Sequence, residues 1–99
     1  MANAFLPVAG KTVNINVSSS SQEVRLGNPD SIRIMNNGTA TVWVDFGINS
    51  ATATTTASMP VGPGVTEVVR YQSNGGPLYV AAIAAGATGI IYFTPGNGI

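Results

Sequence analysis

The sequence contains no cysteine and no histidine, and it carries only four basic and four acidic residues in 99. Without the first two residue types the chain cannot form disulfides, thiol nucleophiles, the usual zinc sites or a histidine general base. The eight charges cancel, and four cations are too few for the basic face of a nucleic-acid-binding protein or for a polybasic membrane anchor. We therefore expect neither a nucleic-acid partner nor a membrane partner.

Long hydrophobic runs are also absent. The longest weakly polar stretch, residues 78–85, is too short to cross a bilayer as a helix. The first seven residues lack the positively charged start of a signal peptide. The polar residues are mostly uncharged, with eight Ser, ten Thr, nine Asn and two Gln. Because proteins with so little charge tend to associate, we interpret this composition as a surface that is covered by other protein.

The residue types that favour helices are scarce, which points to a β protein. Three Leu stand against 11 Val, eight Ile and ten Thr, and side chains branched at Cβ suit a pleated sheet. Twelve Gly and six Pro cut the chain into short pieces. Seven or eight strands at a spacing of about 8–12 residues predict an all-β fold, either a β-sandwich or a small barrel.

The expected strands can be placed along a single domain of residues 11–99, which follows an N-terminal arm of residues 1–10. Asn36-Asn37-Gly38 predicts a hairpin, and the last two strands are expected to pair across Gly86-Ala87. The prolines of residues 59–64 exclude a central strand there, and residues 95–98 have the composition of a turn. The expected strands are residues 11–17, 22–26, 31–35, 40–46, 65–71, 78–85 and 88–93.

Residues that could carry out chemistry are few and scattered. The four carboxylates are Glu23, Asp30, Asp45 and Glu67, and each suits a turn or a solvated strand face. A glycosidase pair would need two of them at a defined separation, and no segment resembles a calcium-binding loop. The glycine-rich segments are followed by neither the lysine nor the helix of a phosphate-binding loop. We expect no enzymatic activity, no cofactor and no metal.

Three features suggest association instead, and the first is Trp43. It alternates with Asp45 on the strand face opposite Val42, Val44 and Phe46. If the valines and Phe46 face the core, Trp43 points outward, where a tryptophan is a typical interface anchor. The alternative is a strand covered on both sides, whose Trp43 is shared with the core.

The second feature is that the last two strands are apolar on both faces. A sandwich strand needs only one apolar face, so the other could meet a second subunit. The residues predicted at this interface are Tyr79, Ile83, Ile91 and Phe93. The alternative is a central strand that lies beneath a loop.

The third feature is the N-terminal arm, which carries no charge. Phe5, Leu6 and Val8 offer apolar side chains to a partner protein or to a neighbouring subunit, while Pro7 keeps the backbone extended. Strand addition to a sheet edge would satisfy the backbone of the arm. The alternative is an ordinary first edge strand.

Several hydrophobic strands and turns follow one another in a distinctive order. The segments are Ser31-Ile32-Arg33-Ile34-Met35-Asn36-Asn37-Gly38-Thr39-Ala40, Val42-Trp43-Val44-Asp45-Phe46-Gly47, Met59-Pro60-Val61-Gly62-Pro63-Gly64, Tyr79-Val80-Ala81-Ala82-Ile83 and Ile91-Tyr92-Phe93-Thr94-Pro95-Gly96-Asn97-Gly98. In this order they resemble the small head decoration, or cement, proteins of tailed bacteriophages. Many members of that family end in Gly-Glu-Gly, and Asn97 stands here in place of the acidic residue.

The resemblance implies a jelly-roll-like sandwich, often a homotrimer, that binds the major capsid protein on the exterior of the phage head after synthesis in the host cytoplasm. It implies no catalytic residue. Such a protein would stabilise the capsid shell by binding only the assembled form. The alternative is a tail or fibre adhesion module that binds a host surface glycan, for which Trp43 beside Asp45 is the only supporting feature.

Overall fold

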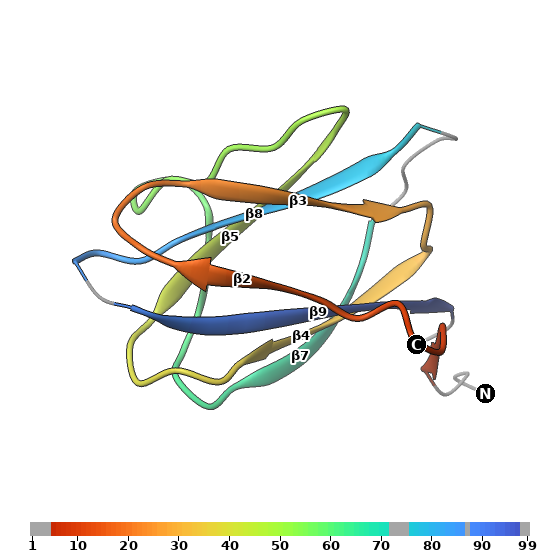
Figure 1. Ribbon diagram of the computed structural model, residues 1–99, viewed down its shortest axis with the longest axis horizontal. Helices are drawn as coiled ribbons and strands as arrows, with labels where there is room; N and C mark the ends of the chain where they lie inside the picture. The colour runs from red at the N-terminus through yellow and green to blue at the C-terminus, as the bar shows by residue number, and fades with distance from the viewer. Residues whose placement is uncertain (1–4, 72–75, 87, 98–99) are drawn as a thin grey trace.

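The computed structural model describes residues 5–71, 76–86 and 88–97 (Figure 1), and in these ranges the backbone forms strands and turns without an α-helix. This confirms the all-β prediction. The described part of the chain forms nine strands: β1 (Leu6–Pro7), β2 (Val13–Val17), β3 (Gln22–Gly27), β4 (Ser31–Asn36), β5 (Val42–Ile48), β6 (Met59–Val61), β7 (Thr66–Arg70), β8 (Leu78–Ile83) and β9 (Gly89–Asn97).

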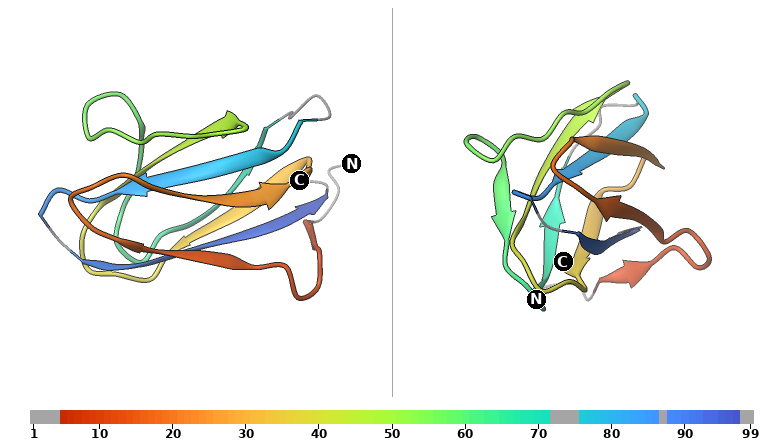
Figure 2. Two further views of the ribbon diagram at one scale, coloured as in Figure 1. Left: turned by 45° about the horizontal axis from the view of Figure 1, so that its top comes forward. Right: turned by 60° about the vertical axis from the view of Figure 1, so that its left-hand side comes forward.

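The strands form two antiparallel sheets that pack face to face (Figure 2). The five-stranded sheet has the order β1-β9-β4-β7, and β2 pairs with β9 beside β1. The four-stranded sheet has the order β3-β8-β5-β6. From β2 to β5 and again from β7 to β9, each consecutive strand lies in the other sheet. This alternation, with four strands of β2–β9 in each layer, is the wiring of a jelly roll.

Two predicted hairpins are therefore wrong. The Asn36-Asn37-Gly38 turn connects β4 to β5, and the segment after β8 leads to β9, but both connections cross between the sheets. Instead, β4 pairs with β9 and β7, while β8 pairs with β3 and β5. An Asn-Gly turn sets the direction of the chain locally, but it does not decide which strand becomes the hydrogen-bonded neighbour.

Asn36 holds the crossing from β4 to β5 in place. Its side chain is fully buried, and Nδ2 donates hydrogen bonds to the carbonyl oxygens of Ala40 at 2.9 Å and Val61 at 3.0 Å. Its Oδ1 accepts a hydrogen bond from the backbone N–H of Gly38 at 3.0 Å. One amide side chain thus connects the turn to the end of β6, and all its polar atoms have partners.

The core fills the space between the two sheets. Alternate residues of the strands face it, because successive side chains on a strand point to opposite sides. Val42 and Val44 of β5 are buried and Phe46 is half-buried, as the alternation on this strand predicts. The buried cluster consists of Ile15, Val17, Leu26, Ile32, Ile34, Val42, Val44, Val61, Leu78, Val80, Ala82, Ala84, Ile91 and Phe93.

The end of β9 is a strand where the composition predicts a turn. Pro95 pairs with Ile32 of β4, and its carbonyl oxygen accepts a hydrogen bond from the N–H of Val8 at 2.9 Å. A residue in an antiparallel strand directs its N and its O to the same neighbour. The N–H that proline lacks would therefore face the arm, so Pro95 removes no hydrogen bond from the pairing with β4.

Candidate interaction surfaces

The outer surface of the five-stranded sheet, which we call the open face, is defined by residues opposite the core positions. Inward Ile15, Ile34, Val69 and Ile91 fix the alternation on the four long strands. The described outward positions are Asn14 and Asn16 on β2, Arg33 and Met35 on β4, Thr66, Val68 and Arg70 on β7, and Ile90, Tyr92 and Thr94 on β9.

Apolar side chains occupy the centre of the open face. Met35 lies between its cross-strand neighbours Thr66 and Tyr92, and is 40% exposed. Val68 is 38% exposed on the next strand, and Ile90 is half-buried. Cross-strand neighbours on one face lie about 4.5–5.5 Å apart at Cβ, so the face combines an apolar centre with neutral polar neighbours.

The charges on the open face are all of one sign. Arg33 and Arg70 are its only charged residues among the described positions, and no carboxylate lies on it. Glu67 belongs to β7 but stands opposite inward-facing Ile34, so it projects from the inner side at the edge of the sheet. A charge in that position discourages another strand from pairing with β7.

The outer surface of the four-stranded sheet is covered by the chain's own loop, residues 49–58. The N–H of Ala53 donates to Ser21 Oγ at 2.9 Å, beside the start of β3. At the other end of the loop, Ser58 Oγ donates to Asp45 Oδ2 on β5 at 3.0 Å. Because β8 lies between β3 and β5, the loop passes over the central strand.

The low exposure of side chains beneath and within residues 49–58 agrees with this cover. Ala81 faces outward on β8 yet is 0% exposed, and Ala53 of the loop is 2% exposed. The two apolar faces of β8 are therefore explained within one chain, because the strand is central and lies beneath a loop. We call this surface the covered face.

Trp43, Ile83 and Tyr79 all lie on the covered face and are half-buried. Trp43 stands directly opposite Ile83, with Pro60 of edge strand β6 on its other side. Tyr79 lies four residues from Ile83 along β8, beyond the loop-covered Ala81. The structure thus brings Trp43 and Ile83 together but places Tyr79 apart from them.

Residues 1–4 of the arm lie outside the described residues, and residues 5–8 of it pack against their own chain. Leu6 and Pro7 stand opposite Asn97 and Gly96, and a Cβ added at Gly96 would lie 2.6 Å from the Phe5 ring. Phe5 therefore packs over Gly96, which leaves room for the ring because it has no side chain. Leu6 remains 65% exposed and Val8 40% exposed. The described part of the arm thus contributes the short edge strand β1, at the end of the sandwich opposite Trp43.

Two of the predicted interface residues are core residues. Ile91 and Phe93 are 0% exposed and face the opposite sheet, because the register of β9 pairs them with Asn36 and Ile34, two buried residues on the inner side of β4. The outward residues of this strand are Ile90 and Tyr92, which the sequence reasoning passed over. It also missed Met35, which lies between the buried Ile34 and Asn36 on β4 and therefore points outward.

Within the described ranges, the structure gathers no group of three His, Cys, Asp or Glu residues that could hold a metal ion. In the same ranges, no helix is long and apolar enough to cross a membrane. Each buried side-chain nitrogen or oxygen there has a hydrogen-bond partner. The buried polar groups are accounted for by the fold itself.

No family model matches the chain, and no curated protein matches it. Among solved structures, PirA is similar, with a TM-score of 0.60 at 14% identity over 89% of this chain and 95% of PirA. Hydroxypropylphosphonic acid epoxidase from S. wedmorenis matches with a TM-score of 0.50 at 9% identity, over 85% of this chain and 42% of the epoxidase. The coat protein of tobacco streak virus has a TM-score of 0.43 at 5% identity, over 91% of this chain and 90% of the coat protein.

These similarities concern the fold alone. PirA and the epoxidase share the arrangement of strands at identities too low to carry over an activity, and a TM-score of 0.43 adds nothing to the argument. One fold commonly supports many functions. The function of this chain must therefore be argued from its own surfaces.

Proposed function

We propose that the chain is a virion structural protein of a tailed bacteriophage, a decoration or cement protein that binds the major capsid protein on the exterior of the head. The observation that carries this proposal is the contrast between the two sheets. Residues 49–58 lie over the central part of the covered face, whereas the described positions of the open face expose apolar and neutral polar side chains and two arginines, and include no carboxylate. The resemblance of the sequence to decoration proteins supplies the identity of the partner.

The exposed hydrophobic residues support docking through the five-stranded sheet. Leu6, Val8, Met35, Val65 and Val68 lie on its strands or next to them, and of the six large hydrophobics exposed in the described ranges only Ile48 belongs to the other sheet. A standard interface buries about 800 Å² on each partner. That is roughly 15% of the 5329 Å² accessible surface, which one face of a two-sheet sandwich can supply.

In this proposal the mechanism is physical and requires no catalytic residue. Burial of a large apolar side chain contributes about 1.5–3 kcal/mol when it is complete. Binding to the assembled shell, but not to free subunits, stabilises the shell by mass action. We propose a homotrimer as the bound form, in which the exposed Leu6 and Val8 of the arm contact the capsid or a neighbouring copy.

The alternative, a tail or fibre module that binds glycan, rests on Trp43 and Asp45. Here, Asp45 is already occupied, because Oδ2 accepts a hydrogen bond from Ser58 and Oδ1 accepts one from the backbone N–H of Phe46 at 2.9 Å. Each carboxylate oxygen can accept a second hydrogen bond, so these contacts reduce what Asp45 can offer to a sugar and fix its orientation toward its own chain. This geometry favours the decoration protein over the adhesion module.

A binding experiment with undecorated heads tests the proposal. Met35→Glu and Val68→Glu place a charge on the open face, and Ile48→Glu is the matched control on the other sheet, with 37% exposure against 40% and 38%. We expect the first two variants to bind heads at least tenfold more weakly and the control to bind as the parent does. Binding should also vary little with salt, because few charges are involved.

Equal binding of heads by all three variants would show that the open face is not the surface that contacts the capsid. Binding to tails or to host glycan, with none to heads, would overturn the proposed function itself. Light scattering should give the mass of a trimer in solution, and a trimer seen only on the capsid would also agree with the proposal. Monomers on the head would contradict it.

A further inference from the structure

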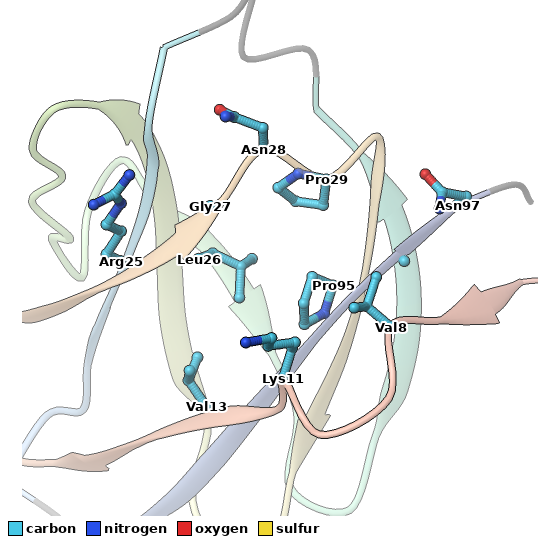
Figure 3. A pocket seen from close by; sticks show the side chains of 11 residues that line it. Val8, Lys11, Val13, Arg25, Leu26, Gly27, Asn28, Pro29, Pro95 and Asn97 are labelled. Atoms are coloured by element: carbon cyan, nitrogen blue, oxygen red, sulfur yellow. The ribbon is translucent and has the colours of Figure 1, made fainter.

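A pocket of about 420 Å³ opens where β2 and β3 separate, at the end of the sandwich that also carries the arm. Its size falls in the range of about 300–1,000 Å³ that is usual for small-molecule sites. Four segments enclose it, shown in Figure 3: the end of the arm, the start of β2, the end of β3 with the turn that follows it, and the end of β9.

The floor of the pocket is apolar and belongs to the core. Leu26 is 8% exposed, and Pro29 and Pro95 are also buried. Val13 is half-buried beside them, and Val8 of the arm closes one side. A compact hydrocarbon group would therefore replace water over a surface that is already continuous with the hydrophobic core.

Both charged residues that line the pocket are cations. They are Lys11 and Arg25, and no carboxylate lines it among the residues the structure describes. Neither cation forms an ion pair in the described ranges. In Figure 3 the Lys11 ammonium group lies in the view between Val13 and Leu26, whereas the Arg25 guanidinium lies beyond Leu26 at the far rim. Lys11 is thus the cation placed to meet a bound group, and Arg25 contributes at longer range.

From these observations we propose that the pocket binds a small organic carboxylate with a compact apolar body. The hydrocarbon lies on Leu26, Pro29 and Pro95, and the carboxylate pairs with the Lys11 ammonium group. This combination of an apolar floor and few polar groups that fix the orientation is typical of ligand sites. No residue of the open face lines the pocket, and Val8 is the one lining residue that the proposed capsid contacts also use. The loss of one function would therefore not remove the other.

The probe is cyclohexanecarboxylate, compared with the neutral cyclohexanecarboxamide and with acetate, which lacks the apolar body. Titration is followed by backbone amide resonances of the full chain. We expect saturable shifts at the lining residues with the carboxylate, at least fivefold weaker binding of the carboxamide, and no saturable shift with acetate. Equal binding of the carboxylate and carboxamide, or the absence of a saturable shift, would overturn the proposal.

Variants then test the assigned residues. Lys11→Gln should weaken binding about two- to fivefold, as expected for a partly exposed ion pair, and Arg33→Gln on the open face should leave it unchanged. Val8→Asp should weaken binding much more than Val8→Asn does. The two new side chains have the same shape, but only the aspartate carries a negative charge that repels the carboxylate of the ligand. If Arg33→Gln weakens binding as much as Lys11→Gln does, the ligand is attracted by general charge and the assigned site is wrong.

Discussion

Replacement of Asn36 by alanine should destabilise the fold more than any change to a neighbouring polar residue. The side chain is 0% exposed and makes three hydrogen bonds, to Gly38, Ala40 and Val61. A hydrogen bond contributes about 0.5–1.5 kcal/mol net, and a buried group left without a partner costs about 1–3 kcal/mol. Water can reach some of the freed groups at the turn, so we expect a loss of about 2–4 kcal/mol in the free energy of unfolding.

That loss is large for a domain of this size, whose total stability is typically about 5–15 kcal/mol. It corresponds to a decrease of roughly 8–32 °C in melting temperature, since 1 kcal/mol shifts a domain of about 100 residues by some 4–8 °C. Asn36→Asp is the sharper variant, because it keeps the shape but offers a carboxylate to two carbonyl oxygens. Aspartate should therefore be at least as destabilising as alanine.

Urea unfolding at fixed protein concentration measures the effect. Trp43 is the only tryptophan and lies half-buried on β5, so its fluorescence reports the transition. The control is Asn37→Ala at the exposed neighbour, which should change stability by no more than about 0.5 kcal/mol. If Asn36→Ala unfolds at the midpoint of the parent protein with an unchanged slope, the buried amide does not hold the crossing between the sheets.

Other predictions concern close contacts. Gly47→Ala should lower the free energy of unfolding by about 1–3 kcal/mol, because the added Cβ would collide with the carbonyl of Ser50. A urea midpoint equal to that of the parent protein would contradict the turn geometry. Gly96→Ala should detach the arm, since the added Cβ would lie 2.5 Å from Leu6 O, so limited proteolysis should remove the arm faster. Gly62→Ala, whose Cβ would meet Val65 at 3.4 Å, is the control. Ala81→Leu should lift residues 49–58 and destabilise by about 1–3 kcal/mol, whereas Ala85→Leu at an exposed position should not; equal stability of the two variants would argue against the cover.

The elements of the fold follow closely from the sequence, but their pairing does not. In the sequence Val13, Ile15 and Val17 alternate with polar residues, and on β2 they share the more buried face. Turn residues indicated where strands stop, and the prolines of residues 59–64 were compatible only with the edge strand β6. The partner of each strand depends on long-range packing between layers, which a turn such as Asn37-Gly38 does not encode.

The candidate surfaces could be predicted only in part, because they also depend on packing between segments that are far apart in the sequence. Apolar residues on both faces of β8 indicated a second cover, but residues 49–58 supply it from within the chain, and no short-range pattern in that Ala- and Thr-rich loop reveals where it lies. On β9 the face exposed to solvent depends on the register with β4, so Ile91 and Phe93 could not be distinguished from Ile90 and Tyr92. The pocket near Lys11 is formed by segments far apart in the sequence.

The most direct test of the central claim is a reconstruction of phage heads saturated with the protein, at a resolution that separates the two sheets. The account predicts many copies on the outside of the shell, with the open face, including Met35, Val68 and Tyr92, against the major capsid protein. The loop of residues 49–58 should face away from the shell. Density confined to the tail, or a protein that contacts the capsid through the loop while its open face remains in solvent, would contradict it.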